Sequence, residues 1–171
     1  YQIEEYINSH SIKLHPVQYE IIKYNETLGE IKKMQISISQ CHFLHLIVKI
    51  IKPKNILEIG TFTGLSALTM GLAMDENSKL TALDKNKETS DVAISFFKKA
   101  KIDNKINLLI NNAKRAKFYP LVQPRINIKD ITLPFDIVLL GLGIDGHFAS
   151  LFPEQVNLSS ALSIDADPDF I

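Results

Sequence analysis

One stretch of the chain, Ile56–Ser66 with the sequence ILEIGTFTGLS, constrains the fold more than any other. An apolar run of strand length leads into a turn with glycines at positions 60 and 64, and the run from Leu65 to Met74 is apolar and helix-forming. A strand, a glycine turn and a helix in this order are typical of the first unit of a parallel α/β sheet that binds nucleotides. Glycine at Gly60 and Gly64 permits positive φ and lets a ligand come close to the backbone.

Two acids stand beside this turn in the predicted sheet. Glu58 lies inside the apolar strand, and because burying an unpartnered carboxylate is costly, we expect it to face a cleft or a positively charged ligand group. Asp84 ends the next predicted strand, about twenty residues beyond the turn, where Rossmann-like proteins hydrogen-bond ribose hydroxyls. Asp84 is therefore a second candidate ligand residue, with capping of the following helix as the alternative.

The rest of the chain supplies the other elements of a Rossmann-like, doubly wound and mostly parallel sheet with flanking helices. The helix expected over residues 41–51 has an apolar face formed by Phe43, Leu44, Leu46, Ile47, Val48 and Ile50. Ser39 is the expected N-cap of that helix. We also expect helices within residues 1–33 with a break near Pro16, and a helix over 87–100 whose inward side chains are Val92, Ala93, Phe96 and Phe97. The expected further strands cover residues 79–83, 106–110 and 136–140.

Composition excludes several classes of protein. The 171 residues suffice for one ordinary domain, and nineteen basic residues balance nineteen acidic ones, so we expect no nucleic-acid partner. No apolar run approaches about 18 residues, so no membrane span is expected. The single Cys41, without a signal peptide, predicts a cytoplasmic protein. The chain begins at Tyr1 rather than Met, and we expect a fragment.

A histidine pair offers a weak metal signal. His42 and His45 are three residues apart on the 41–51 helix, a spacing that two metal ligands can use. Without a nearby Glu or third His, the pattern favours a surface pair or partly buried core histidines.

From about Val17 to Asn111 the chain resembles the caffeoyl-coenzyme A type of O-methyltransferase, a cation-dependent family. The matching motifs are MQIS followed by a Gln-x-x-Phe-Leu helix, LEIGTFTGLSAL, LTALDKNKE and AKIDNKINLL. The resemblance implies S-adenosylmethionine (SAM) as cofactor, a small-molecule hydroxyl as methyl acceptor and a homodimer. It also implies cofactor contacts from Ile36 through its backbone and from Glu58, Gly60, Thr61, Ser66, Asp84 and Ala113.

The resemblance departs from this family at the metal site. The family's fourth strand ends in Asp-Ala-Asp-Lys, which holds a divalent cation, whereas the predicted strand in 134–143, PFDIVLLGLG, ends in leucines and glycines. We therefore expect no metal. Asp165 and Asp167 repeat the letters near the C-terminus, but they follow a polar loop and Pro168 replaces the lysine, so a hard-cation site there is the minority alternative.

From about Asn112 to the end of the chain the residues resemble the central part of 6-phosphogluconolactonase, first in AKFYPL and then in PFDIVLLGLGIDGHFASLFP over residues 134–153. The resemblance implies that His147 is the general base that activates water on the lactone, a role suited to histidine near neutral pH. It also implies that Asp145 shapes the site and that Gly141, Gly143 and Gly146 lie in the loop beside the sugar phosphate. The phosphate-binding regions of that family have no counterpart in this chain.

These patterns predict a truncated or hybrid protein with two parts, residues 1–111 and residues 112–171, that complete one sheet. In that sheet the strand over 136–140 is parallel to the Ile56 strand and adjacent to it. Three functions stay open: a SAM-dependent O-methyltransferase, a 6-phosphogluconolactonase, and an inactive hybrid that only binds SAM.

Overall fold

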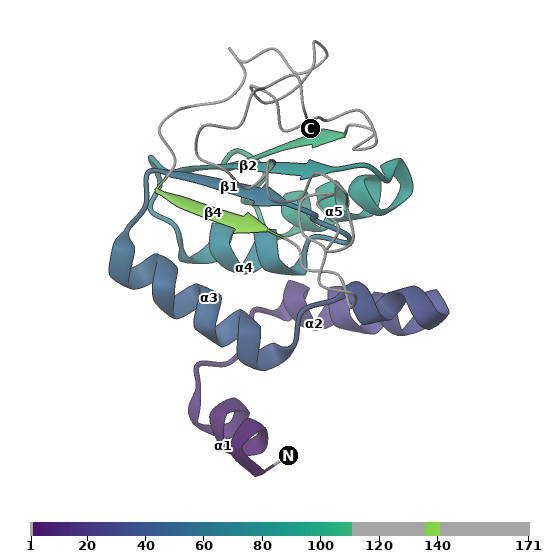
Figure 1. Cartoon of the computed structure of the whole chain (residues 1–171), viewed down its shortest axis with the longest axis vertical. Coiled ribbons are helices and arrows are strands. Elements are labelled where there is room, and N and C mark those ends of the chain that lie inside the picture. The colour runs from purple at the N-terminus through teal and green to yellow at the C-terminus, as the bar shows by residue number, and fades with distance from the viewer. Residues whose placement is uncertain (1, 111–135, 141–171) are drawn as a thin grey trace, which may run out of the picture.

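The computed structural model describes residues 2–110 and 136–140, and these build a parallel sheet with helices packed against it (Figure 1). The strands are β1 (Asn55–Ile59), β2 (Lys79–Asp84), β3 (Ile106–Ile110) and β4 (Ile137–Leu140), in the order β3-β2-β1-β4. All three pairings are parallel. The predicted α/β class is confirmed. The direction of the strand order switches between β1 and β4, and ligands bind at such a switch point, at the carboxyl ends of the strands.

The strand at the far end of the chain takes the predicted fourth place. β4 pairs with β1 in a register that joins Ile56 to Ile137 and Ile59 to Leu140. The Asp136 carboxylate links the start of β4 to the start of β1. Its Oδ2 accepts hydrogen bonds from the backbone N–H groups of Lys54 (2.6 Å) and Asn55 (2.8 Å). These two N–H groups hold the pKa of Asp136 below its usual value. The predicted position of this strand is therefore confirmed.

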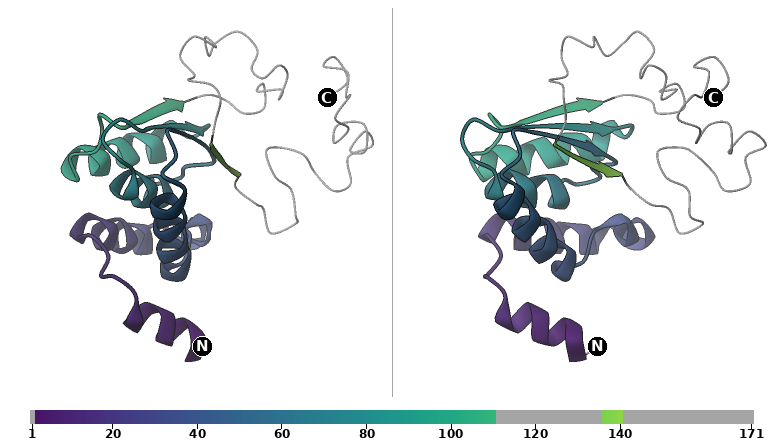
Figure 2. Two further views of the ribbon diagram at one scale, coloured as in Figure 1. Left: turned by 90° about the vertical axis from the view of Figure 1, so that its left-hand side faces the viewer. Right: turned by 60° about the vertical axis from the view of Figure 1, so that its left-hand side comes forward.

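The described helices lie on one face of the sheet, as Figures 1 and 2 show. Pro16 begins a helix after a break, as predicted, because proline fits the first helical position. The helices are α1 (Gln2–His10), α2 (Pro16–Asn25), the 3₁₀ helix η1 (Glu26–Met34), α3 (Ile38–Ile51), α4 (Leu65–Ala73) and α5 (Lys87–Lys99).

The prediction of Ser39 as the N-cap of α3 is wrong. Ser37 is the cap, and its hydroxyl accepts a hydrogen bond from Gln40 N while the Gln40 side chain accepts one from Ser37 N. This reciprocal pair is a capping box, and it starts the helix earlier than the apolar pattern alone suggests.

The core lies between the sheet and α4. Eight of the nine residues of α4 are buried, and Leu68 and Met70 are fully enclosed with Ile56 and Leu80 of the sheet. Outside α4 lie α2 and α3 (Figure 1). A buried hydrogen bond from Gln18 Nε2 of α2 to Thr69 Oγ1 of α4, at 2.7 Å, joins these helix layers. Along α5, Ala93 and Phe97 are buried and Phe96 partly so, as predicted.

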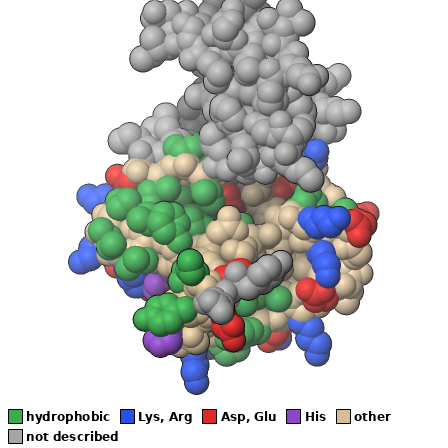
Figure 3. Space-filling view, turned by 60° about the horizontal axis from the view of Figure 1, so that its bottom comes forward, with side chains coloured by type: hydrophobic (Ala, Val, Ile, Leu, Met, Phe, Trp, Pro, Cys, Tyr) green, Lys and Arg blue, Asp and Glu red, His purple; other side chains and the backbone are tan. Residues whose placement is uncertain are grey.

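The predicted apolar face of α3 is split between core and surface. Val48 is buried, whereas Phe43, Leu46 and Ile50 are 61%, 55% and 67% exposed. Hydrophobic side chains gather on the side of the molecule where α3 lies (Figure 3). Within the described residues no single helix is long and apolar enough to span a membrane; the bent pair Pro16–Met34 and Ile38–Ile51 meets that test by length and composition only.

Candidate functional site

The glycine turn between β1 and α4 has the backbone shape that its sequence suggests. Gly60 and Gly64 have φ of 90° and 89°, and Phe62 also lies in the left-handed region with φ of 52°. At Gly64 the glycine is required by packing as well, because a Cβ there would lie 2.8 Å from the Phe97 ring and 2.9 Å from Ala93 Cβ. Gly64 thus serves helix packing rather than ligand approach, whereas the exposed Gly60 leaves the backbone accessible.

Asp84 closes the turn from the end of β2. Its Oδ2 accepts hydrogen bonds from Thr61 N (2.8 Å) and Phe62 N (2.7 Å), and its Oδ1 accepts one from Asn86 N (2.9 Å). The capping alternative for Asp84 is wrong, because Asn86 is the N-cap of α5 and its side chain accepts hydrogen bonds from Glu88 N and Thr89 N. Asp84 is half-buried and faces the turn.

Glu58 is fully buried below the turn. Ser66 Oγ donates a hydrogen bond of 2.5 Å to Glu58 Oε1, while Glu58 Oε2 has no partner among the described residues. Burial raises the pKa of Glu58 to about 7; the Ser66 and Thr61 hydroxyls oppose this shift, and the charge of Asp84 adds to it. The Thr61 hydroxyl lowers the pKa of Glu58 from a nearby position, although it makes no hydrogen bond of good geometry with the carboxylate.

Three buried polar atoms thus gather at the turn without hydrogen-bond partners in the described part of the chain. They are Glu58 Oε2, Thr61 Oγ1 and Thr63 Oγ1. Because an unpaired buried polar group costs about 1–3 kcal/mol, such a cluster indicates a site that a polar ligand completes. A carboxylate with a free oxygen fits a cationic or hydrogen-bond-donating group.

The other predicted site residues are not joined to this cluster by the structure. Ile36 lies in the connection between η1 and α3, half-buried and packed against the core. Residues outside the described part of the chain are Ala113, Gly141, Gly143, Asp145, Gly146, His147, Asp165 and Asp167.

The two histidines of α3 are both half-buried. Burial lowers the pKa of both His42 and His45, as expected for partly buried core histidines, and the positive charge of Lys49 lowers that of His45 further. Within residues 2–110 and 136–140 no three His, Cys, Asp or Glu side chains are grouped as metal ligands.

Two residues near the turn were not predicted from the sequence. Asn86 caps α5, and its position directly before the helix, two residues after Asp84, was the available signal. Thr63 places a buried hydroxyl in the glycine turn, and no sequence pattern distinguishes it from a surface threonine.

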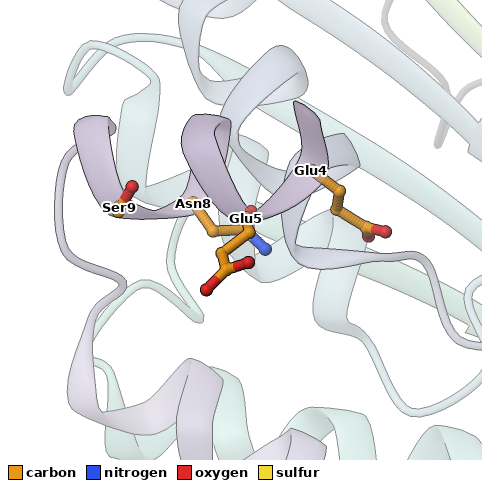
Figure 4. Close-up of a pocket in the computed structure, with 4 residues that line it drawn as sticks. All are labelled: Glu4, Glu5, Asn8 and Ser9. Carbon is orange, nitrogen blue, oxygen red and sulfur yellow. The ribbon is translucent and has the colours of Figure 1, made fainter. Parts of the chain in front are cut away.

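A surface hollow on α1 lies away from this site. It is lined by Glu4, Glu5, Asn8 and Ser9 (Figure 4), at the opposite end of the molecule from the sheet in Figure 1. It contains none of the predicted site residues.

The fold and the turn define a Rossmann-like α/β protein with buried, unpartnered polar atoms at the carboxyl end of β1 within the described residues. Residues 8–133 match the O-methyltransferase family, and the chain belongs to this SAM-dependent family. The match continues beyond residue 111, where the predicted second part begins.

Two relatives illustrate the similarity. The probable caffeoyl-CoA O-methyltransferase 3 of Dictyostelium discoideum is 34% identical over 114 residues, which cover 66% of this chain and 45% of the relative. The tapetum-specific methyltransferase 1 of Arabidopsis thaliana is 35% identical over 107 residues, which cover 60% and 46%. The chain therefore spans about half the length of the curated relatives it matches.

Solved structures agree on the fold. The SAH-bound methyltransferase PaMTH1 of Podospora anserina aligns with a TM-score of 0.66 at 20% identity, over 80% of this chain and 54% of that one. The O-methyltransferase TomG of Streptomyces achromogenes, in complex with SAM, aligns with a TM-score of 0.66 at 22% identity, over 80% and 58%. These matches support no 6-phosphogluconolactonase segment.

Proposed function

We propose that this chain carries the cofactor site of an enzyme that transfers a methyl group from SAM to a hydroxyl of a small molecule. The single observation that carries the proposal is the Oε2 of the buried Glu58 beside the glycine turn, which has no partner in the described part of the chain. In an α/β sheet of this order the turn after β1 is where a nucleoside ligand lies.

The residues present fit SAM. The free oxygen of Glu58 would accept from its ammonium group, and because this oxygen is buried, the pairing would be stronger than in water. Asp84 would accept from the ribose, and Gly60 would permit close approach of the ligand to the backbone. Ser66 holds Glu58 in place through its hydroxyl. Contacts from Ile36, Thr61 and Ala113 rest on the family resemblance.

When bound, SAM supplies an electrophilic methyl group. The residues of this chain bind and orient it, which lowers the entropic cost of bringing the methyl group to an acceptor oxygen. No role is assigned to a divalent cation, because the sequence after Leu140 reads Gly-Leu-Gly where the resembled family has acids. The acceptor is a small molecule, and its identity lies beyond the residues that form this site.

The test is calorimetric titration of the chain with SAM at pH 8, repeated with Glu58→Gln and with added magnesium. We expect micromolar binding that weakens at least about tenfold in the variant, because the amide cannot neutralise the ammonium group. Magnesium is expected to change nothing. Glu5→Gln, which removes an exposed carboxylate of α1, is the matched control.

Glu58→Gln separates a binding role from a structural one. Removing a buried carboxylate should stabilise the fold at pH 8 while it weakens SAM binding, so the two readouts move in opposite directions. Absence of SAM binding by the folded wild-type chain would refute the proposal.

The alternative activities remain predictions from the sequence. Lactone hydrolysis depends on His147, outside the described residues, and turnover of 6-phosphogluconolactone by the wild-type chain but not by His147→Ala would establish it. Binding of SAM without methyl transfer to any tested hydroxyl would leave the inactive hybrid.

The proposed homodimer is supported by the exposed apolar side chains of Phe43, Leu46 and Ile50, and sedimentation equilibrium tests it.

A further inference from the structure

The glycine turn contains an anion-binding concavity that the chain fills with its own side chain. The backbone N–H groups of Thr61 and Phe62, consecutive in sequence, both donate to Asp84 Oδ2, at 2.8 and 2.7 Å. Phe62 has a left-handed φ of 52°, which turns successive N–H groups toward one point. Successive N–H groups in such a conformation form a nest, a backbone shape that binds anions.

Two further features would make an uncovered turn attractive to phosphate. Helix α4 begins directly after the turn, and its N-cap, Gly64, has no side chain to satisfy the first N–H groups of the helix. A helix N-terminus of this kind carries partial positive charge and favours phosphate groups. Glycine-rich loops before helices cradle nucleotide phosphates through the same two effects.

We infer that Asp84 is a specificity-determining residue: its carboxylate occupies the nest, so the turn accepts nucleosides and rejects ligands that place a phosphate there. A phosphate would have to displace a charge-assisted pair of hydrogen bonds. It would also approach the carboxylate of Glu58, which lies buried under the same turn. Above pH 7, where Glu58 is ionised, the two negative charges would repel each other.

Asp84 retains capacity for one more donor. A carboxylate offers about four acceptor positions, and the N–H groups of Thr61, Phe62 and Asn86 occupy three of them. The remaining position is on Oδ1, the oxygen that accepts only from Asn86 N. Asp84 therefore holds the turn through Oδ2 and keeps one acceptor position, on Oδ1, for a donor of the ligand. The identity of that nucleoside rests on the proposed function, whereas the exclusion of phosphate does not.

The experiment follows the amide resonances of Thr61 and Phe62 during titration with inorganic phosphate. The wild-type chain is expected to show no saturable shift of these two amides. Asp84→Ala uncovers the nest, and we expect its phosphate affinity at these amides to rise at least about tenfold. Asp84→Asn keeps an acceptor oxygen, so the nest stays covered and the affinity stays near that of wild type.

Asp103→Ala is the charge control. It removes the same charge from an exposed position before β3, outside the hydrogen bonds of the turn, and should respond like wild type. A wild-type chain that binds phosphate at these amides as tightly as Asp84→Ala would overturn the inference. So would a folded Asp84→Ala chain that gains no affinity.

Amide hydrogen exchange in the wild-type chain gives a test without a variant. Thr61 and Phe62 should be protected when no ligand is present, and exchange at the rate of an open loop would overturn the inference even if Asp84→Ala does not fold. None of these measurements involves SAM. A chain that fails to bind SAM but passes them would refute only the proposed function.

Discussion

Ser66, in the first turn of α4, donates its hydroxyl hydrogen to Glu58 in the middle of β1. This bond spans the glycine turn and fixes the helix start to the preceding strand. The carboxylate that it holds is fully buried and keeps one oxygen unpaired among the described residues. The strand, the turn and the helix thus share a single titratable group.

Glu58 should make the free energy of unfolding depend on pH. Its pKa is about 7 in the folded chain against an ordinary value of 4.5, so the folded state holds the proton more tightly. The stability contribution is therefore fully present below pH 4.5 and is lost as pH rises to about 7. The loss amounts to about 3 kcal/mol at most.

Denaturant unfolding of wild type and Glu58→Gln between pH 4.5 and 8 measures this term. The stability of wild type relative to the variant should fall across that range and level off above pH 7. A difference that stays constant with pH would show that Glu58 does not titrate in this window. Glu5→Gln, at an exposed position, should produce no such trend.

Removing the Ser66 hydroxyl should cost more at high pH than at low pH. In Ser66→Ala, Glu58 Oε1 loses its donor, and an ionised carboxylate suffers from this loss more than a protonated one. We expect a destabilisation of about 1–3 kcal/mol at pH 8 and a smaller one at pH 5. In the double variant Ser66→Ala, Glu58→Gln, the extra cost at pH 8 should disappear; its persistence would contradict this interpretation.

Gly64 combines backbone strain with a packing requirement. Its φ of 89° and ψ of 14° lie in the left-handed α region, where an alanine loses about 1 kcal/mol through strain. In Gly64→Ala the added Cβ also meets the Phe97 ring at 2.8 Å, so we expect a further loss of about 1–3 kcal/mol. A loss no larger than the strain alone, measured by urea unfolding, would exclude the packing role of Gly64.

Asp136 should govern the attachment of β4. Asp136→Ala removes the acceptor of Lys54 N and Asn55 N, and we expect faster hydrogen exchange of these two amides and of β4. Because the folded pKa of Asp136 is lowered, its stabilisation is present above the ordinary pKa of an aspartate and is lost as pH falls through the folded value. Asp136→Asn, which keeps an oxygen acceptor, should retain most of the protection; unchanged exchange in the alanine variant would refute the role.

Local sequence features suffice to predict most of the elements and the α/β class. Apolar runs of strand length, glycine at the turn and the apolar helix after it are local features, so β1, β2, β3 and α4 follow from spacing alone. The place of β4 beside β1 was predicted from the resemblance to the methyltransferase sheet, in which it takes the fourth place, and the register confirms it. Which serine caps α3 was not, since it depended on a reciprocal bond between Ser37 and Gln40.

The roles of the acids near the turn became clear from contacts between elements far apart in the chain. The partners of Asp84 are backbone groups 22 and 23 residues away in sequence, and backbone N–H groups leave no trace in a residue pattern. The depth of Glu58 likewise depends on α4 covering β1, and the exposure of Phe43 and Leu46 depends on which face of α3 meets its neighbours. Periodicity shows that a face is apolar, whereas contact between elements far apart in the chain determines whether that face is covered.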